Sequence, residues 1–379
     1  MMLKNILILF TFFITTNLAS QKNKHVLYGE KAIYYQPLEN EFGLFFDKNG
    51  DIYSNDIIKK TDLIAHKSSL KEFYKQNPAR FLAISKKYNL EFITYSDENF
   101  SVFQDSIAVK NIRKINKFQE NSSLFILIHG FRKSFVKRTR STTSIEDYAY
   151  LKKGILNVQK DTTKTKFLEI YWDGMFDSFF GEEKSPLKEI LKLYEKEAQQ
   201  NAKQTGYALR KIVSKIDTKQ YHIITHSLGA QVGICLLTNA YANTIDKHIT
   251  KLKTPSQNKI NVFMIAPAMS SEPFKEYYNR ETNLNFEEND NYFLSVIYNK
   301  KDIVLRKKIF IFGPGPKKYG NTTLGCNHKN EIGVLEDLFT NNYKNSFLKT
   351  YSTTENKDHR IKNYIKTKNF KNYILEISN

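Results

Sequence analysis

Apolar runs alternate with helical stretches from residue 122 onward, and this alternation predicts an α/β fold. Short, continuously apolar segments are typical of parallel strands buried on both faces. We expect such strands at residues 124–128, 166–172, 221–225, 260–265, 292–298 and 347–351. Apolar residues at helical spacing predict helices at residues 145–158, 187–216 and 228–241. The order predicts a mostly parallel, doubly wound sheet with helices on both faces, whose chemistry lies where the strands end.

The beginning of the chain follows a different pattern. Lys4 precedes an apolar run at residues 6–18, and the small residues Ala19 and Ser20 follow it, which is the arrangement of a secretory signal peptide. The run is too short to span a hydrocarbon core of roughly 30 Å. We therefore expect residues 1–20 to be removed, leaving a secreted or periplasmic protein.

Residues 21–121 contain no recognisable set of catalytic or ligand-binding residues. They are predicted to extend the sheet or to form a small module packed on it. Strands are expected at residues 32–35, 44–53 and 90–95, and a helix at residues 69–87. Asn49-Gly50 lies between apolar runs and predicts a type I′ hairpin turn. The acidic residues beside this turn lack the spacing of a calcium-binding loop. Residues 122–379 are expected to form the main, catalytic domain.

The composition is that of an ordinary globular chain. The 379 residues are 41% hydrophobic and 26% charged, and their mean hydropathy of −0.50 argues against a polytopic membrane protein. The formal net charge is +19, but the cations are scattered and accompany no nucleic-acid-reading module, so we expect no nucleic-acid partner. Cys235 and Cys326 are too few for a disulfide scaffold or a four-thiolate zinc site, and their pairing is left open.

The strongest chemical signal is a serine between a predicted strand and a predicted helix, within Thr-His-Ser-Leu-Gly at residues 225–229. In a nucleophile elbow the residues two before and two after the serine must be small because the turn is tight. Gly229 meets this requirement, whereas Thr225 is bulkier than the usual glycine. We predict that Ser227 is a nucleophile. The alternative is a serine that only caps the helix. Within the long predicted helix upstream, Gly206 is expected to be a break.

A second motif, His129-Gly130-Phe131, ends another predicted apolar strand. The oxyanion of an acyl-transfer reaction needs two preorganised N–H donors. We assign these donors to the backbone of Leu228 and Phe131, with Gly130 permitting close approach. His129 precedes the predicted acid in the chain, and we expect it to order the loop rather than to react.

An acid and a base complete the pattern. Asp302 follows the predicted strand at residues 292–298 and is expected to orient a catalytic imidazole, the alternative being an exposed loop aspartate. The histidines after it are His328 and His359. Because His359 alone follows the last predicted strand, it comes at the correct edge of the sheet, and we predict it as the base.

Together, the His-Gly-Phe strand end, the His-Ser-Leu-Gly turn, Asp302 and His359 resemble the α/β-hydrolase superfamily, and within it the lipase-like hydrolases known as the DUF900 group. The resemblance spans residues 122–366 and implies an α/β-hydrolase fold with an N-terminal extension. It also implies acyl transfer to water, in which Ser227 attacks, His359 transfers the proton and Asp302 holds the imidazole tautomer.

We therefore expect a secreted serine hydrolase, most simply a carboxylic ester hydrolase, acting on a small-molecule or lipid acyl substrate. The alternatives are a non-catalytic binding protein on this scaffold and an acyltransferase or peptidase with the same triad. Residues 131–140 carry five cations and no acid, so we expect Arg138 and Arg140 to favour an anionic substrate or membrane surface, unless this is only a solvated loop. His222 and His226 lack the remaining features of a metalloprotease site, so we expect no metal or other cofactor.

Overall fold

The computed structural model describes most of the chain. The described residues are 24–26, 32–34, 37–54, 69–131, 144–159, 161–174, 197–218, 220–241, 259–277, 292–306, 322–342, 347–353 and 358–378. The predicted signal peptide and the predicted substrate-binding residues Arg138 and Arg140 lie outside them. Within the described part, no helix is long and apolar enough to cross a membrane.

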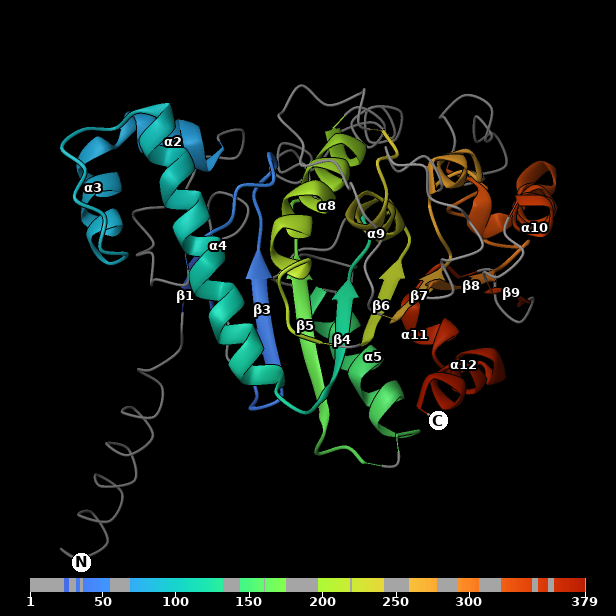
Figure 1. The fold of residues 1–379 in the computed structure, drawn as a ribbon. Coiled ribbons are helices and arrows are strands. Elements are labelled where there is room, and N and C mark those ends of the chain that lie inside the picture. The colour runs from blue at the N-terminus through green and yellow to red at the C-terminus, as the bar shows by residue number, and fades with distance from the viewer. Residues whose placement is uncertain are drawn as a thin grey trace, which may run out of the picture.

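A seven-stranded sheet, parallel throughout, forms the centre of the fold (Figure 1). In spatial order its strands are β3 (Glu41–Phe45), β5 (Thr165–Tyr171), β4 (Ser123–Ile128), β6 (Gln220–His226), β7 (Lys259–Ile265), β8 (Tyr292–Tyr298) and β9 (Phe347–Ser352). The six strands predicted from residue 122 onward are all present, and the predicted fold class is confirmed. Because neighbouring strands run parallel, all seven end at the same edge.

Helices cover both faces of the sheet (Figure 1). One face carries α4 (Asp97–Gln119), α8 (Gln199–Val213) and α9 (Gly229–Leu237). The other carries α5 (Ser144–Leu156), α11 (Ile361–Tyr364) and α12 (Lys368–Ser378). The remaining described elements are β1 (Lys24–Val26), β2 (Ala32–Tyr34), α2 (Leu70–Gln76), α3 (Pro78–Lys86), α10 (Glu331–Asn342) and the short 3₁₀ helices Glu272–Tyr277, Leu324–Cys326 and His328–Asn330.

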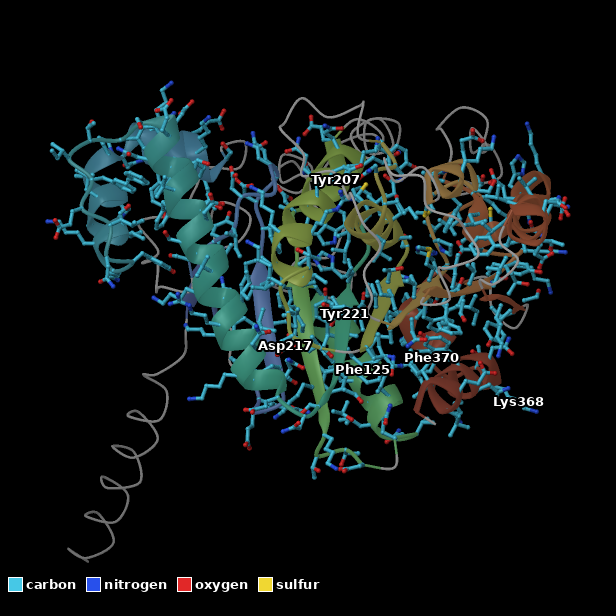
Figure 2. All side chains as sticks on the ribbon, viewed as in Figure 1. Phe125, Tyr207, Asp217, Tyr221, Lys368 and Phe370 are labelled. Carbon is cyan, nitrogen blue, oxygen red and sulfur yellow. The ribbon has the colours of Figure 1, made fainter. Side chains whose placement is uncertain are left out.

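The central strands are apolar along their length because both of their faces are covered. Phe125 on β4 is fully buried and stacks on His222 of β6, with 4.6 Å between the ring centroids. The hydroxyl of Tyr221 donates to the carbonyls of Val213 and Ile216, at 2.9 and 3.0 Å, and so ties the end of α8 to the start of β6. Figure 2 labels Phe125 and Tyr221 within this layer.

The predicted type I′ turn is wrong. That turn needs positive φ at both central residues, but only Gly50 has one, at +77°. The carboxylate of Asp47 accepts the N–H groups of Asn49 and Asp51, both at 2.8 Å, and the Gly50 N–H donates to the Asp47 carbonyl at 3.0 Å. By accepting these N–H groups, Asp47 favours a three-residue turn that ends in a glycine of left-handed conformation. A single bridged pair, Phe46 with Ile52, flanks this turn, where the prediction placed a strand across residues 44–53.

The predicted helix at residues 69–87 is divided into α2 and α3 at Asn77. Pro78 has no N–H and disfavours helical geometry in the residue before it, and Asn77 has φ of −128°. The predicted strand at residues 90–95 is also wrong, because this segment pairs with no strand of the described chain. Two of its aromatic residues pack on Phe81 instead.

Helix α4 has 23 residues and was not expected from the sequence. The sequence nevertheless contains a signal for the start of this helix. The hydroxyl of Ser96 caps it by accepting the Asn99 N–H at 3.1 Å. Its buried side chains also recur at helical spacing, at Phe100, Phe103 and Ile107. The buried polar residues Asn111 and Gln119 interrupt the apolar side of this helix and so weaken its apolar pattern.

The sequence predicted a helix break at Gly206. This prediction is wrong, because Gly206 lies inside α8. A β-carbon at this position would stand 2.5 Å from the carbonyl oxygen of Val232 on α9. The glycine therefore allows the two helices to approach closely, and tertiary contact overrides its low helix propensity.

The edge strand β3 is joined to the sheet by a buried ionic cluster. The ammonium of Lys152 on α5 donates to the carboxylates of Glu41 on β3 and Glu169 on β5, the latter at 2.6 Å. The hydroxyl of Tyr171 donates to the second oxygen of Glu169, also at 2.6 Å. Glu169 is 1% exposed, so this network lies in the interior. Through Glu41, a strand from the N-terminal segment contributes a charge to it.

Candidate active site

Ser227 lies at the carboxyl edge of the sheet, between β6 and α9. Its φ of +53° is in the left-handed region, which a non-glycine residue adopts at a cost and which a nucleophile elbow requires. Its N–H donates to the carbonyl of Ile265 and its own carbonyl accepts the N–H of Ala268, both at 2.9 Å. The backbone of the turn is thus held from the neighbouring strand, and the strand-turn-helix context predicted around the serine is present.

Small residues around the turn allow it to be this tight. A β-carbon at Gly229 would stand 2.5 Å from the carbonyl oxygen of His129, so α9 begins directly against the end of β4. Thr225 occupies the position that usually holds glycine. Its methyl group lies 3.0 Å from the place of a β-carbon at Gly233, one turn further along α9. The second glycine therefore accommodates the bulk of the threonine.

The structure brings the His-Gly-Phe segment against the serine. A β-carbon at Gly130 would stand 2.8 Å from the β-carbon of Ser227 and 3.0 Å from the carbonyl oxygen of His226. Phe131 follows this contact directly, and Leu228 is the first residue after the serine. Because the first N–H groups of a helix have no acceptor within the helix, Leu228 is in a position typical of an oxyanion donor.

His129 is buried in contacts that order the loop. Its Nε2 accepts the backbone N–H of Trp172 at 3.3 Å, and its carbonyl accepts the indole N–H of the same residue at 2.9 Å. The two rings are stacked, with centroids 5.4 Å apart. Its backbone N–H donates to the hydroxyl of Tyr148 at 3.0 Å. These contacts involve both the ring and the backbone of His129, and they are those expected of a histidine that orders the loop.

Asp302 and His359, which are far apart in the sequence, are hydrogen-bonded to each other. The Oδ2 of Asp302 lies 2.6 Å from the Nδ1 of His359. The other oxygen, Oδ1, accepts the N–H groups of Val304 and Leu305, both at 3.0 Å. Asp302 is fully buried, and among the described residues its carboxylate binds His359 rather than His328.

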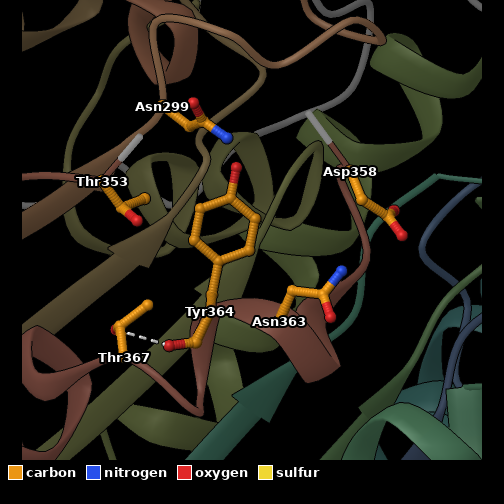
Figure 3. Close-up of a pocket in the computed structure, with 6 residues that line it drawn as sticks. All are labelled: Asn299, Thr353, Asp358, Asn363, Tyr364 and Thr367. Atoms are coloured by element: carbon orange, nitrogen blue, oxygen red, sulfur yellow. Dashed lines mark hydrogen bonds between the residues drawn. The ribbon is translucent and has the colours of Figure 1, made fainter. Parts of the chain in front are cut away.

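Tyr364 was not identified from the sequence. Its hydroxyl donates to Oδ2 of Asp302 at 3.0 Å, the same oxygen that His359 approaches. Tyr364 comes from the short helix α11, where nothing in the local pattern indicates a function. It forms part of a small pocket beside Asp302, shown in Figure 3. The pocket is lined by Asn299, Thr353, Asp358, Asn363, Tyr364 and Thr367.

The electrostatics of this group favour an ionised acid. Burial by itself would raise the pKa of Asp302, but the neighbouring His359, the Leu305 N–H and the Tyr364 hydroxyl hold this pKa below its ordinary value. Burial and the adjacent carboxylate raise the pKa of Tyr364, which therefore keeps its proton and stays a donor at neutral pH.

His226 contacts the other side of His359. Its Nε2 lies 2.9 Å from the carbonyl oxygen of His359, and the ring centroids are 4.9 Å apart. The Nε2 of His359 is buried and has no hydrogen-bond partner among the residues that the structure describes. His359 is thus held at Nδ1 and at its main-chain carbonyl.

The two cysteines are both buried free thiols, so they do not pair with each other. Burial raises the pKa of each to about 12, which makes them poor nucleophiles. In the described part of the chain, no three His, Cys, Asp or Glu side chains gather closely enough to hold a metal ion.

A parallel sheet with a strained serine between strand and helix defines an α/β hydrolase. The family model "Alpha/beta hydrolase of unknown function (DUF900)" matches residues 104–308, and the chain belongs to this family, which confirms the resemblance seen in the sequence. The matched region includes Ser227 and Asp302 and ends before His359. Among solved structures, an esterase of Pyrococcus furiosus is similar at 10% identity and a TM-score of 0.32, over 68% of this chain and 81% of the esterase. No curated protein matches the sequence.

Proposed function

We propose that this α/β hydrolase is a serine hydrolase that cleaves a carboxylic ester through an acyl-enzyme. One observation carries the proposal: a buried carboxylate, Asp302, holds Nδ1 of His359 at 2.6 Å, at the same sheet edge as the strained turn of Ser227. A carboxylate that orients an imidazole at the same sheet edge as a strained serine turn is the arrangement that activates a hydroxyl nucleophile.

In the proposed mechanism, the Oγ of Ser227 attacks the ester carbonyl carbon while Nε2 of His359 accepts the hydroxyl proton. Asp302 keeps the Nδ1 proton in place and stabilises the imidazolium. The backbone N–H groups of Phe131 and Leu228 donate to the oxyanion, and removal of one such donor typically costs about 3 kcal/mol. Collapse of the intermediate breaks the ester C–O bond, and Nε2 returns the proton to the departing alcohol.

Deacylation repeats the same steps with water. His359 takes a proton from the water as its oxygen attacks the acyl carbon, and the second intermediate releases the carboxylic acid and restores the Ser227 hydroxyl. Among the residues that the structure describes, the Nε2 of His359 has no hydrogen-bond partner, which agrees with this role because catalytic hydrogen bonds are often long without substrate and shorten in the complex.

The location of the enzyme and its substrate charge are parts of the same proposal. The apolar run at residues 6–18 favours export, and the cations Arg138 and Arg140 favour an anionic acyl substrate or membrane surface. Expression with and without residues 1–20, followed by mass analysis of the secreted chain, tests the export. Turnover of matched charged and neutral esters by the Arg138→Gln Arg140→Gln variant tests the charge preference.

The decisive test is intact-mass labelling of the mature chain with a fluorophosphonate, which reports an activated serine without knowledge of the substrate. We expect one label on the wild type and none on Ser227→Ala or His359→Ala. Ser270→Ala, which alters another buried serine at the same sheet edge, is the matched control and is expected to label normally. A folded wild type that takes no label would contradict the proposal and favour a non-catalytic binding protein.

If the wild type takes the label, the unlabelled enzyme is then used to assign the reaction class. Hydrolysis of aryl esters is measured in the presence of added alcohols and amines, and the products are separated by chromatography. Free acid as the main product supports an ester hydrolase. New esters or amides as the main products would instead indicate an acyltransferase, and cleavage of peptide substrates alone would indicate a peptidase.

A further inference from the structure

The position of His359 depends on a neighbour that the proposed mechanism does not use. His359 lies outside the helices and strands. It comes directly before Arg360, which occupies the N-cap position of α11. Ladder hydrogen bonds therefore do not hold its main chain. The contacts described for it are Asp302 at Nδ1 and His226 at the carbonyl oxygen.

His226 is well placed for this contact because it belongs to a central strand and is buried. It is the last residue of β6, is 2% exposed, and immediately precedes the serine turn. A β-carbon at Gly130 would stand 3.2 Å from its Nδ1 and 3.0 Å from its carbonyl oxygen, so the end of β4 packs directly on it. Its ring then lies against the ring of His359, with 4.9 Å between the centroids.

The contact also defines a tautomer. A carbonyl oxygen only accepts, so the Nε2 of His226, 2.9 Å from the oxygen of His359, must carry a proton. The hydrogen bond therefore needs a donor at the outer end of the side chain. A glutamine amide reaches about as far as Nε2, whereas an asparagine amide reaches only about as far as Nδ1.

We infer that His226 is a positioning residue for the base: it donates to the main-chain carbonyl of His359 and thereby orients that imidazole toward the neighbouring Ser227. The inference rests on the proposed serine-hydrolase function. Asp302 holds the side chain of His359 and His226 holds its main chain, and the two anchors together restrict rotation of the ring. A misplacement of about 1 Å in a reacting group can lower the rate about 100-fold.

The test compares variants that separate the donor from the ring. His226→Gln retains an outer N–H donor, His226→Phe retains an aromatic ring without a donor, and His226→Asn retains an amide that is too short. His222→Phe removes another buried histidine of the same strand, one that contacts Phe125 and Asn261, and serves as the matched control. Urea unfolding of each variant establishes that it is folded.

We expect kcat for an aryl ester to fall about 10- to 100-fold in His226→Phe and His226→Asn with little change in KM. His226→Gln should recover kcat to within about threefold of the wild type, and His222→Phe should leave kcat unchanged. Equal losses in the Gln and Phe variants, or a wild-type kcat in the Phe and Asn variants, would overturn the inference.

A second measurement keeps the inference separable from the proposed function. The hydrogen-bonded Nδ1 proton of His359 gives a low-field proton NMR signal, which is assigned by its loss in His359→Gln. The signal should shift or broaden in His226→Phe and persist in His226→Gln, even if the wild type fails to hydrolyse esters. An unchanged signal in the folded His226→Phe variant would overturn the positioning role, whereas the lack of fluorophosphonate labelling would overturn only the proposed function.

Discussion

Gly130 faces Ser227 so closely that a β-carbon at position 130 would stand 2.8 Å from the β-carbon of the serine. Side chains do not pack at such distances, so only glycine fits here without a shift of one strand end. The contact brings the residue after Gly130, Phe131, to the nucleophile turn, where its N–H is proposed to bind the oxyanion.

Gly130→Ala should therefore move the end of β4 away from the serine turn and misplace one oxyanion donor. We expect kcat for an aryl ester to fall about 100- to 1000-fold, as for removal of one donor. Gly154→Ala is the control, because its β-carbon would meet side chains alone, the ring edge of Phe370 at 3.0 Å and the β-carbon of Ile365 at 3.7 Å. A Gly130→Ala enzyme with wild-type kcat would contradict this assignment of the oxyanion site.

Tyr364→Phe removes one donor to the Oδ2 of Asp302 without changing the ring. A hydrogen bond to a charged group contributes about 1.5–3 kcal/mol, so we expect kcat to fall about tenfold or more and the urea midpoint to decrease. Tyr373→Phe on α12 is the matched control, because that buried hydroxyl has no partner among the described residues. Its removal should leave kcat unchanged and stability equal or higher. Equal effects of the two substitutions on kcat would show that Tyr364 does not act through Asp302.

The pair Thr225 and Gly233 is expected to be energetically coupled. Gly233→Ala places a methyl group 3.0 Å from the Cγ2 of Thr225, and overpacking of this kind costs about 1–3 kcal/mol of unfolding free energy. Thr225→Ser removes that methyl group, so Gly233→Ala should cost less in the Thr225→Ser background. Urea unfolding of the four chains measures the coupling as a double-mutant cycle. Additive effects would mean that the threonine is accommodated in some other way.

The lowered pKa of Asp302 predicts a specific dependence of stability on pH. An aspartate carboxyl in the unfolded chain has a pKa of about 3.9, and the pKa of Asp302 in the folded chain is lower. Its contribution is therefore present above about pH 4 and is lost as the pH falls through the folded pKa. We expect the difference in unfolding free energy between the wild type and Asp302→Asn to be larger at about pH 6 than at about pH 3. A difference that does not change with pH would be inconsistent with the lowered pKa.

Lys152→Met tests whether the N-terminal strand β3 belongs to the cooperative core. The substitution leaves the buried carboxylates of Glu41 and Glu169 without their cation, and breaking a buried ion pair costs about 3–5 kcal/mol. We expect a single urea transition at a lower midpoint. Two separate transitions, or no change in the midpoint, would indicate that β3 folds independently of the sheet. Lys349→Met, at an exposed ion pair, is the control and should change stability by less than about 1 kcal/mol.

Local sequence patterns were reliable where one element decides its own structure. The turn at Ser227 was predictable because a tight strand-to-helix turn restricts the residues on each side of it. The apolar segments of β4, β6 and β7 were predictable because strands buried on both faces exclude polar residues along their length. The single helix predicted at residues 69–87 was wrong because the proline after Asn77 divides it.

Other features depend on contacts that no local pattern contains. The continuity of α8 through Gly206 is decided by its contact with α9, and the tolerance of Thr225 by Gly233 on the next helix. Tyr364 and His226 reach Asp302 and His359 only because the chain returns to the same sheet edge.

The fold class, the serine turn and the choice of Asp302 and His359 as candidate acid and base could be predicted before the structure, because strand periodicity and the order of motifs along the chain are local or topological properties. How Asp302 and His359 are held became visible in the folded chain alone. Their anchors come from separate elements, and hydrogen bonds across such separations depend on packing geometry rather than on spacing in the sequence.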